Sequence, residues 1–121
     1  MSTILVVDDS KAMRQLIVHT LNQNQHNVMD INDGHAAMDL LSNTNVDIVV
    51  TDKNMPRMDG IKLTKQLRKQ EITKSAPILM LATTQTSQAD IECSKAAGVT
   101  AWLVKPFEPA SLLTEAEKTP A

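Results

Sequence analysis

The chain has 121 residues, of which 42% are hydrophobic and 2% aromatic, so it is long enough for one domain with a largely aliphatic core. Its formal net charge of −2 argues against a nucleic-acid-binding surface. One cysteine, Cys93, excludes an internal disulfide framework and fits a reducing cytoplasm, and the N-terminal apolar run is too short for a signal peptide or a membrane span.

In chain order, the first half of the sequence alternates apolar runs with helical patterns. Ile4–Val7 predicts a buried strand, Asn27–Ile31 a weaker strand at a sheet edge, and Ile48–Thr51 a third, buried strand. The two segments between them have apolar residues at helical spacing, namely Met13, Leu16, Ile17, Thr20 and Leu21 in the first and Ala37, Leu40 and Leu41 in the second.

The second half predicts two more strands, Pro77–Leu81 and Ala101–Val104, each preceded by a helix. The later of these helices begins after Ser87, a capping residue, and ends at Gly98, which suits a left-handed cap. The expected core-facing residues are Ile61, Thr64 and Leu67 in the earlier helix and Ala89, Cys93, Ala96 and Ala97 in the later one.

A short last helix is expected over residues 109–118, with Pro109 in its first turn. Leu112, Leu113 and Ala116 are its clear apolar contacts, so we expect this helix to fray or pack loosely. Five strand–helix repeats with short connections predict an α/β fold, in which helices cover both faces of a parallel sheet. We expect one cytoplasmic domain over residues 1–121, with no nucleic acid or membrane as a direct partner.

Polar residues follow four of the predicted strands. Asp8 and Asp9 follow the first strand, Asp52 the third, Thr83 the fourth and Lys105 the fifth. The carboxyl ends of parallel strands share one edge of the sheet, where ligands bind. If the strand order is 2-1-3-4-5, a common order in such folds, the three aspartates come together.

Three neighbouring carboxylates repel one another, and at least one pKa rises strongly unless a cation compensates them. Lys105 supplies one positive charge, which leaves about two negative charges if all three acids are ionised. A hard divalent cation offsets that remainder, and Mg²⁺ is the usual ion where a phosphate shares the site. The charges therefore predict magnesium and a phosphate at Asp8, Asp9 and Asp52.

At these positions the chain resembles CheY-like response-regulator receiver domains over nearly its whole length. The resemblance is carried by Asp8-Asp9, by Asp52 within TDKNMPRMDG, by Thr83 and by Lys105-Pro106-Phe107. Each motif alone is weak, but their joint occurrence at successive strand ends is highly specific. The resemblance implies a flavodoxin-like (βα)5 fold, a doubly wound, parallel, five-stranded sheet in the order 2-1-3-4-5.

The resemblance also implies a role for each matched residue. Asp52 would accept a phosphoryl group from a histidine kinase and form an acyl phosphate, and the chain would catalyse its own phosphorylation and dephosphorylation without being a conventional enzyme. Lys105, through a cis bond to Pro106, and Thr83 would contact phosphoryl oxygens. The magnesium ligands would be Asp8, Asp9, Asp52 and the backbone carbonyl of Asn54.

Three further residues are expected to affect signalling. Asn54 and Gln85 lie where water would approach the phosphoryl group, so they would influence its lifetime. In the family, an aromatic residue on the fifth strand moves inward when the threonine is drawn to the phosphoryl group, and Trp102 matches that aromatic position. Tyrosine or phenylalanine is more usual there, and tryptophan is larger and needs a partner for its N–H when buried. We therefore expect the inward state to be harder to reach, or the coupling to be weaker.

Together these roles describe a stand-alone response regulator in two-component signalling that binds a downstream protein when phosphorylated. Chemotaxis, with a flagellar motor switch protein as the target, is the nearest analogy, and a phosphorelay intermediate or an adaptor is the alternative. A phosphatase similar to haloacid dehalogenases is a second class of function. Such an enzyme has its nucleophile after the first strand and a second aspartate two residues later. In this chain the acceptor Asp52 follows the third strand, and the residue two positions later is Asn54. A receiver fold with a vestigial site is a further alternative, although the presence of all the required groups argues against it. A flavin or nucleotide binder is another, although the sequence has no phosphate-cradling loop.

Overall fold

The computed structural model describes residues 3–23, 25–55, 57–83 and 86–118. Its strands are β1 (Thr3–Val7), β2 (Asn27–Ile31), β3 (Ile48–Asp52), β4 (Ile78–Thr83) and β5 (Ala101–Lys105). Its helices are α1 (Lys11–Asn22), α2 (Gly34–Leu41), α3 (Gly60–Arg68), α4 (Gln88–Ala97) and α5 (Pro109–Lys118). Each predicted strand and helix is found. Strands β3, β4 and β5 extend one or two residues beyond the prediction, so that Asp52, Thr83 and Lys105 are the last residues of their strands.

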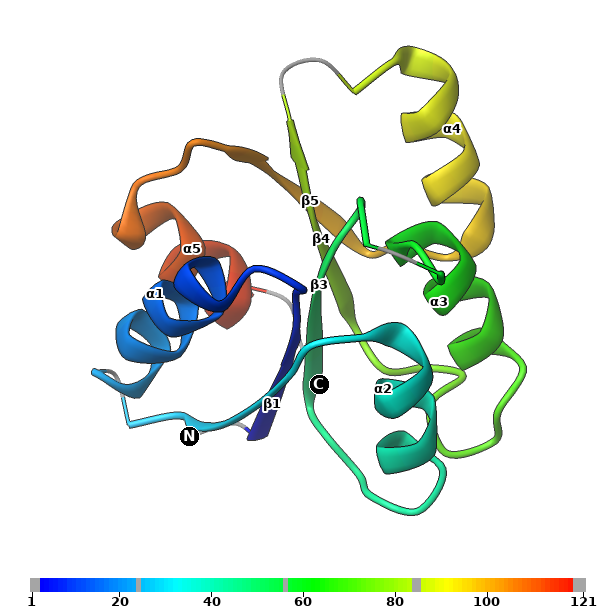
Figure 1. Ribbon diagram of the computed structural model, residues 1–121, viewed down its shortest axis with the longest axis horizontal. Coiled ribbons are helices and arrows are strands. Elements are labelled where there is room, and N and C mark those ends of the chain that lie inside the picture. Colours follow the sequence, from blue (N-terminus) through cyan, green and yellow to red (C-terminus); the bar gives the residue numbers. More distant parts are fainter. Residues whose placement is uncertain (1–2, 24, 56, 84–85, 119–121) are drawn as a thin grey trace.

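The five strands form one parallel sheet in the order β2-β1-β3-β4-β5, which confirms the predicted topology and the edge position of β2. Figure 1 shows α1 and α5 on one face of this sheet and α2, α3 and α4 on the other. None of the helices within the described ranges is long and apolar enough to cross a membrane.

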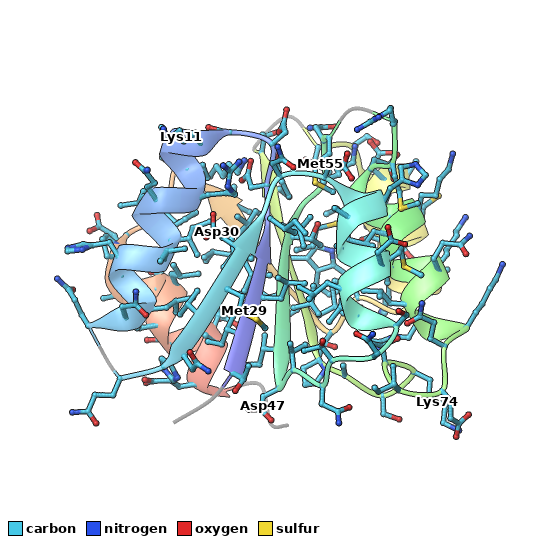
Figure 2. The ribbon with its side chains drawn as sticks, turned by 60° about the horizontal axis from the view of Figure 1, so that its bottom comes forward. Lys11, Met29, Asp30, Asp47, Met55 and Lys74 are labelled. Atoms are coloured by element: carbon cyan, nitrogen blue, oxygen red, sulfur yellow. The ribbon has the colours of Figure 1, made fainter. Side chains whose placement is uncertain are left out.

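The core consists of two aliphatic layers, one on each face of the sheet. Along β1, Leu5 and Val7 contribute to the layer under α2 and α3, whereas Ile4 and Val6 contribute to the layer under α1 and α5. Successive side chains of a strand point to opposite faces, and both faces are covered here, so β1 and β3 are apolar without alternation. Figure 2 shows the side chains filling the space between the sheet and the helices on both sides.

Helix α4 has the predicted ends but not the predicted buried face. Ser87 Oγ accepts a hydrogen bond from the Asp90 N–H, and Gly98 ends the helix with φ of 114°. However, Ala89, Cys93 and Ala96 are exposed, whereas Ser94 and Ala97 are buried. The predicted apolar stripe is therefore wrong for Ala89, Cys93 and Ala96 and right for Ala97. Ser94 can be buried because its hydroxyl donates to the Ile91 carbonyl oxygen at 2.8 Å and accepts from Trp102 Nε1 at 2.7 Å.

Other differences from the predicted core are small. On α1, Leu16 is 43% exposed, and on α3 the buried Leu63 was not predicted, while Ile61 is only partly buried. The bounds of α5 agree with the prediction, and its Leu112 and Ala116 are buried against α1 and the sheet. Loose packing of this helix stays a prediction.

Candidate functional site

The three predicted aspartates are neighbours at the carboxyl edge of the sheet. Strands β1 and β3 pair side by side with Val7 opposite Thr51, so the next residues, Asp8 and Asp52, lie at adjacent strand ends. One carboxylate oxygen from each of Asp8, Asp9 and Asp52 lies within 4.8 Å of the other two. Asp8 is 0% and Asp52 7% exposed, whereas Asp9 is exposed to solvent. Two of the three negative charges are thus placed where water stabilises them poorly.

Asp8 has one oxygen without a hydrogen-bond partner in the described part of the chain. Its Oδ1 accepts a hydrogen bond from the Ser10 N–H at 2.9 Å. Its Oδ2 is buried and has no hydrogen-bond partner in the described part of the chain, and it lies 4.0 Å from Lys105 Nζ. Burial is the main cause that raises the pKa of the Asp8 carboxyl, and the charges of Asp52 and Asp9 add to it, whereas the Ser10 N–H and the charge of Lys105 lower it. A buried oxygen of this kind is a position for a cation.

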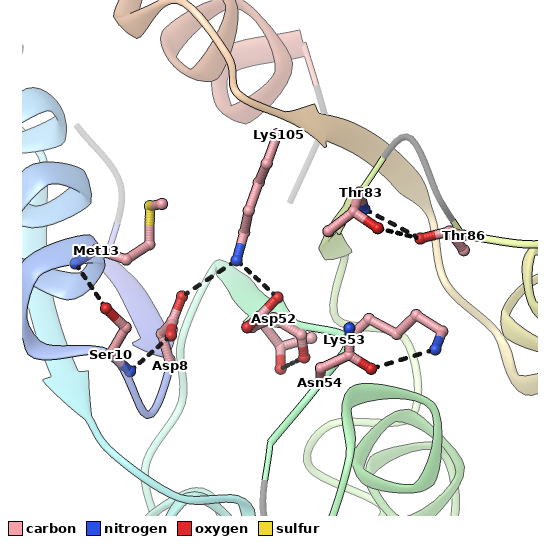
Figure 3. Close-up of polar contacts among 10 residues, drawn as sticks. Asp8, Ser10, Met13, Asp52, Lys53, Asn54, Thr83, Thr86 and Lys105 are labelled. Atoms are coloured by element: carbon pink, nitrogen blue, oxygen red, sulfur yellow. Dashed lines mark hydrogen bonds and ion pairs between the residues drawn. The ribbon is translucent and has the colours of Figure 1, made fainter.

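Lys105 is the positive group of the cluster. It ends β5 and pairs across the sheet with Thr83, and its peptide bond to Pro106 is cis. Its Nζ donates to Asp52 Oδ1 at 2.9 Å, and Figure 3 shows this amino group between the carboxylates of Asp8 and Asp52. The geometry therefore brings together the predicted acids and the predicted lysine.

Thr83 ends β4 on the same edge. Its N–H donates to Thr86 Oγ1 at 3.0 Å, and the two hydroxyl oxygens are 3.3 Å apart (Figure 3). Thr86 was not predicted as part of the site, although a threonine three residues after another in a turn is a common side-chain partner for the backbone. Gln85, expected near the phosphoryl group, lies outside the described residues.

The segment after Asp52 folds back against the end of β3. The Lys53 N–H donates to the Leu81 carbonyl at 3.1 Å, and the Gly60 N–H donates to the Lys53 carbonyl at 2.8 Å. A Cβ at Gly60 would lie 2.4 Å from the Asp52 carbonyl oxygen, so only glycine allows this approach. Asn54 is exposed in this segment, and its Oδ1 lies 3.4 Å from Lys53 Nζ.

Two contacts at helix α4 were also not predicted. Lys53 Nζ lies 3.3 Å from Asp90 Oδ2 in the first turn of α4. Trp102, which stands on β5 away from the acids, is partly buried and donates from Nε1 to Ser94 Oγ. Sequence spacing gave no signal for either contact because each joins residues from different elements.

The donor set fits a magnesium ion. Asp8, Asp9 and Asp52 offer only carboxylate oxygens, the ligands that a hard divalent cation prefers. The buried Asp8 Oδ2 without a hydrogen-bond partner is the observation that supports this fit most directly.

Comparison with known proteins agrees with this geometry. Residues 4–117 match the model of the response regulator receiver domain family. The chain is 40% identical over 116 residues to the chemotaxis protein CheY homolog of Campylobacter jejuni, with 94% of this chain and 88% of that protein covered. It is 38% identical over 116 residues to CheY-3 of Vibrio cholerae, with 95% and 88% covered.

Solved structures show the same fold. The chemotaxis response regulator CheY4 of Vibrio cholerae superposes with a TM-score of 0.91 at 41% identity, and 98% of each chain is covered. The receiver domain of the sensor histidine kinase PA1611 from Pseudomonas aeruginosa, which has a magnesium ion coordinated in its active-site cleft, superposes with a TM-score of 0.89 at 28% identity, with 98% of this chain and 96% of that chain covered. With its sheet order, its acidic edge and these matches, the chain belongs to the family of response regulator receiver domains.

Proposed function

We propose that this chain is a response regulator whose Asp52 accepts a phosphoryl group from a histidine kinase. One observation carries the proposal: Lys105 Nζ bonds Asp52 Oδ1 at 2.9 Å beside a buried Asp8 oxygen that has no hydrogen-bond partner in the described chain. The carboxylate proposed as acceptor thus has the Lys105 cation beside it, and the buried Asp8 oxygen is a candidate ligand for a second cation. This is the arrangement that phosphoryl transfer needs, because the reaction gathers negative charge at one point.

In the proposed reaction, an Asp52 carboxylate oxygen forms a bond to phosphorus while the bond from phosphorus to the donor breaks. The donor group, the imidazole of a kinase histidine, leaves with the electron pair of that bond. Lys105 would turn from Asp52 Oδ1 to pair with a phosphoryl oxygen. The Thr83 hydroxyl would donate a hydrogen bond to another phosphoryl oxygen. Since the buried strand β3 holds Asp52 in place, the attacking oxygen needs little reorganisation.

Asp8, Asp9, Asp52 and the backbone carbonyl of Asn54 would hold the magnesium ion. When bound, this ion would offset the charge of the acids and of the incoming phosphoryl group. Asn54, exposed at the rim, and Gln85 would govern how readily water reaches the acyl phosphate. The chain would in this way promote its own phosphorylation and dephosphorylation.

The signal would pass from the site to a protein partner through Thr83 and Trp102. Movement of Thr83 toward the phosphoryl group would free it from Thr86, and Trp102 would respond on the neighbouring strand. The hydrogen bond from Trp102 Nε1 to Ser94 Oγ supports a restrained tryptophan, which fits the expected weaker coupling. The similarity to chemotaxis proteins favours a cytoplasmic regulator with chemotaxis-type output and a flagellar motor switch protein as target. A phosphorelay or adaptor role is the alternative.

The test is the intact mass of the protein after incubation with acetyl phosphate. With Mg²⁺ the wild type should gain the mass of one phosphoryl group, and both the Asp52→Asn variant and the wild type in EDTA should gain none. A gain that survives Asp52→Asn would overturn the proposal. Steady turnover of phosphomonoesters would instead favour a phosphatase.

A further inference from the structure

A groove between α3 and α4 lies apart from the acid cluster. It has a volume of about 410 Å³ and is lined by Lys65, Arg68, Lys69, Cys93, Ala96 and Ala97. These residues lie in the second half of α3 or α4, except Lys69, which directly follows α3. Helices in this fold begin at the carboxyl edge of the sheet and run away from it. Figure 1 shows α4 lying alongside α3 on the same face of the sheet. The groove is therefore at the end of the molecule remote from Asp52.

One wall of the groove is positively charged. Lys65 and Lys69 are exposed and have no ion pair within the described chain. Arg68 is held in place, because it donates to the Gly98 carbonyl at 2.7 Å and to the Ala76 carbonyl at 2.6 Å. Since carbonyl groups carry no net charge, these contacts fix the guanidinium without neutralising it. None of the six lining residues is acidic, so the groove has three cations with no carboxylate among them.

The other wall is apolar and made of small side chains. Cys93 and Ala96 on α4 are exposed to solvent, and Ala97 lies behind them at 9% exposure. Together with the exposed Ala89 they form the stripe that the sequence predicts to face the core. Because α4 buries Ser94 instead, Cys93 and Ala96 of this stripe are left at the groove that Lys65 and Lys69 also line.

We propose that this groove docks an acidic, amphipathic segment of a partner protein. Apolar side chains of the segment would lie on Cys93 and Ala96, and its carboxylates would pair with Lys65 and Lys69. The volume of about 410 Å³ is within the range of about 300–1,000 Å³ that is usual for small-molecule pockets, so the groove has room for a few side chains of the segment. A nucleic acid is disfavoured because no aromatic residue lines the groove for stacking and the chain's net charge is −2. A lipid surface is disfavoured because no large apolar side chain lines the groove.

The experiment is a selection of random 16-residue peptides displayed on phage against the purified wild-type protein. The double variant Lys65→Glu/Lys69→Glu serves for counter-selection. Lys62→Glu is the matched control, since Lys62 is exposed on the same helix but does not line the groove. The enriched peptides should be acidic with interspersed apolar residues. They should bind the double variant about tenfold or more weakly than the wild type, and bind Lys62→Glu within about twofold.

Cys93 provides a second readout because it is the only cysteine in the sequence and it lines the groove. A selected peptide should slow alkylation of Cys93 by a neutral maleimide, and the double variant should lose this protection. The proposal would be overturned if no peptide is enriched or if the enriched peptides have no acidic bias. It would also be overturned if those peptides bind the double variant as well as the wild type, or if they leave the reactivity of Cys93 unchanged. Preference for an oligonucleotide or for anionic vesicles over every selected peptide would overturn it as well.

This proposal does not depend on phosphorylation at Asp52, and the two can fail separately. The double variant should retain its far-UV circular dichroism spectrum and its magnesium-dependent gain of a phosphoryl group. Loss of peptide binding with this gain intact supports the groove, whereas a wild type that gains no phosphoryl group would reject the proposed function alone.

Discussion

At the scale of single residues, Asp8 is a buried carboxyl that is only partly compensated by its neighbours in the described part of the chain. It is fully buried beside Asp52, one of its oxygens has no hydrogen-bond partner in the described residues, and burial raises its pKa. A carboxyl whose pKa is higher in the folded state binds its proton more tightly there than in the unfolded chain. Ionised Asp8 therefore destabilises the fold, and this effect is fully present above the raised pKa and is relieved as the pH falls through it.

Asp8→Asn should accordingly raise the free energy of unfolding at neutral pH when divalent cations are absent, because it removes a buried charge but keeps the side-chain shape. The gain should shrink as the pH falls through the range in which the folded carboxyl takes up its proton. Urea denaturation across a pH series in EDTA measures this difference. An unchanged or lower stability of Asp8→Asn at neutral pH would contradict the account.

Magnesium should stabilise the wild type more than the Asp8→Asn variant. At a concentration tenfold above its dissociation constant, Mg²⁺ should stabilise the wild type by about 1.4 kcal/mol. Asp8→Asn should lose most of this increment because it has lost an anionic ligand. Thermal unfolding with Mg²⁺ and with Na⁺ at equal ionic strength separates binding from screening.

At the scale of elements, α4 is the helix whose buried face differs from the face that its sequence pattern predicts. Its ends were predictable, since Ser87 and Gly98 act through local hydrogen bonds and local backbone conformation. Its buried face was not, because hydrophobic periodicity counts serine as polar and cysteine as apolar. Ser94 is 1% exposed because its hydroxyl bonds both Ile91 and Trp102, and the second partner stands on a different element.

Ser94→Ala should remove the acceptor of the Trp102 N–H and lower the free energy of unfolding by roughly 1–3 kcal/mol. The fluorescence of Trp102, the only tryptophan in the chain, should change at the same time. In a Trp102→Phe background, which has no indole N–H, the same substitution should have a smaller effect on stability. Equal losses in both backgrounds would show that the hydrogen bond does not restrain the tryptophan.

At the scale of the whole molecule, strand order gathers residues that are far apart in the sequence. Asp8, Asp52 and Lys105 stand at the ends of three strands, and their grouping was predictable because parallel strands end at one edge. What sequence could not supply was the state of each atom: which Asp8 oxygen lacks a partner, or that Thr83 contacts Thr86. Those facts depend on side-chain geometry that no spacing encodes.

The last helix, α5, is held to the rest of the molecule by a few buried apolar side chains. Leu112 is 0% exposed and packs in the same layer as Ile17 and Leu21 of α1. Leu112→Ala should lower the free energy of unfolding by about 2–5 kcal/mol, the range for a buried leucine, and chemical denaturation measures it. A loss well below this range would mean that α5 is as loosely packed as its few apolar residues suggested.

The measurement that tests the central claim most directly is the location of the phosphoryl group. An acyl phosphate is reduced by borohydride to an alcohol, so a phosphorylated aspartate becomes homoserine, a stable mark that mass spectrometry can place. Trypsin cleaves after Lys11, Arg14 and Lys53, which puts Asp52 on a different peptide from Asp8 and Asp9. After treatment with acetyl phosphate and Mg²⁺, the account predicts homoserine at position 52 and unmodified aspartate at positions 8 and 9. Homoserine at position 8 or 9, or none at any of the three positions, would contradict it.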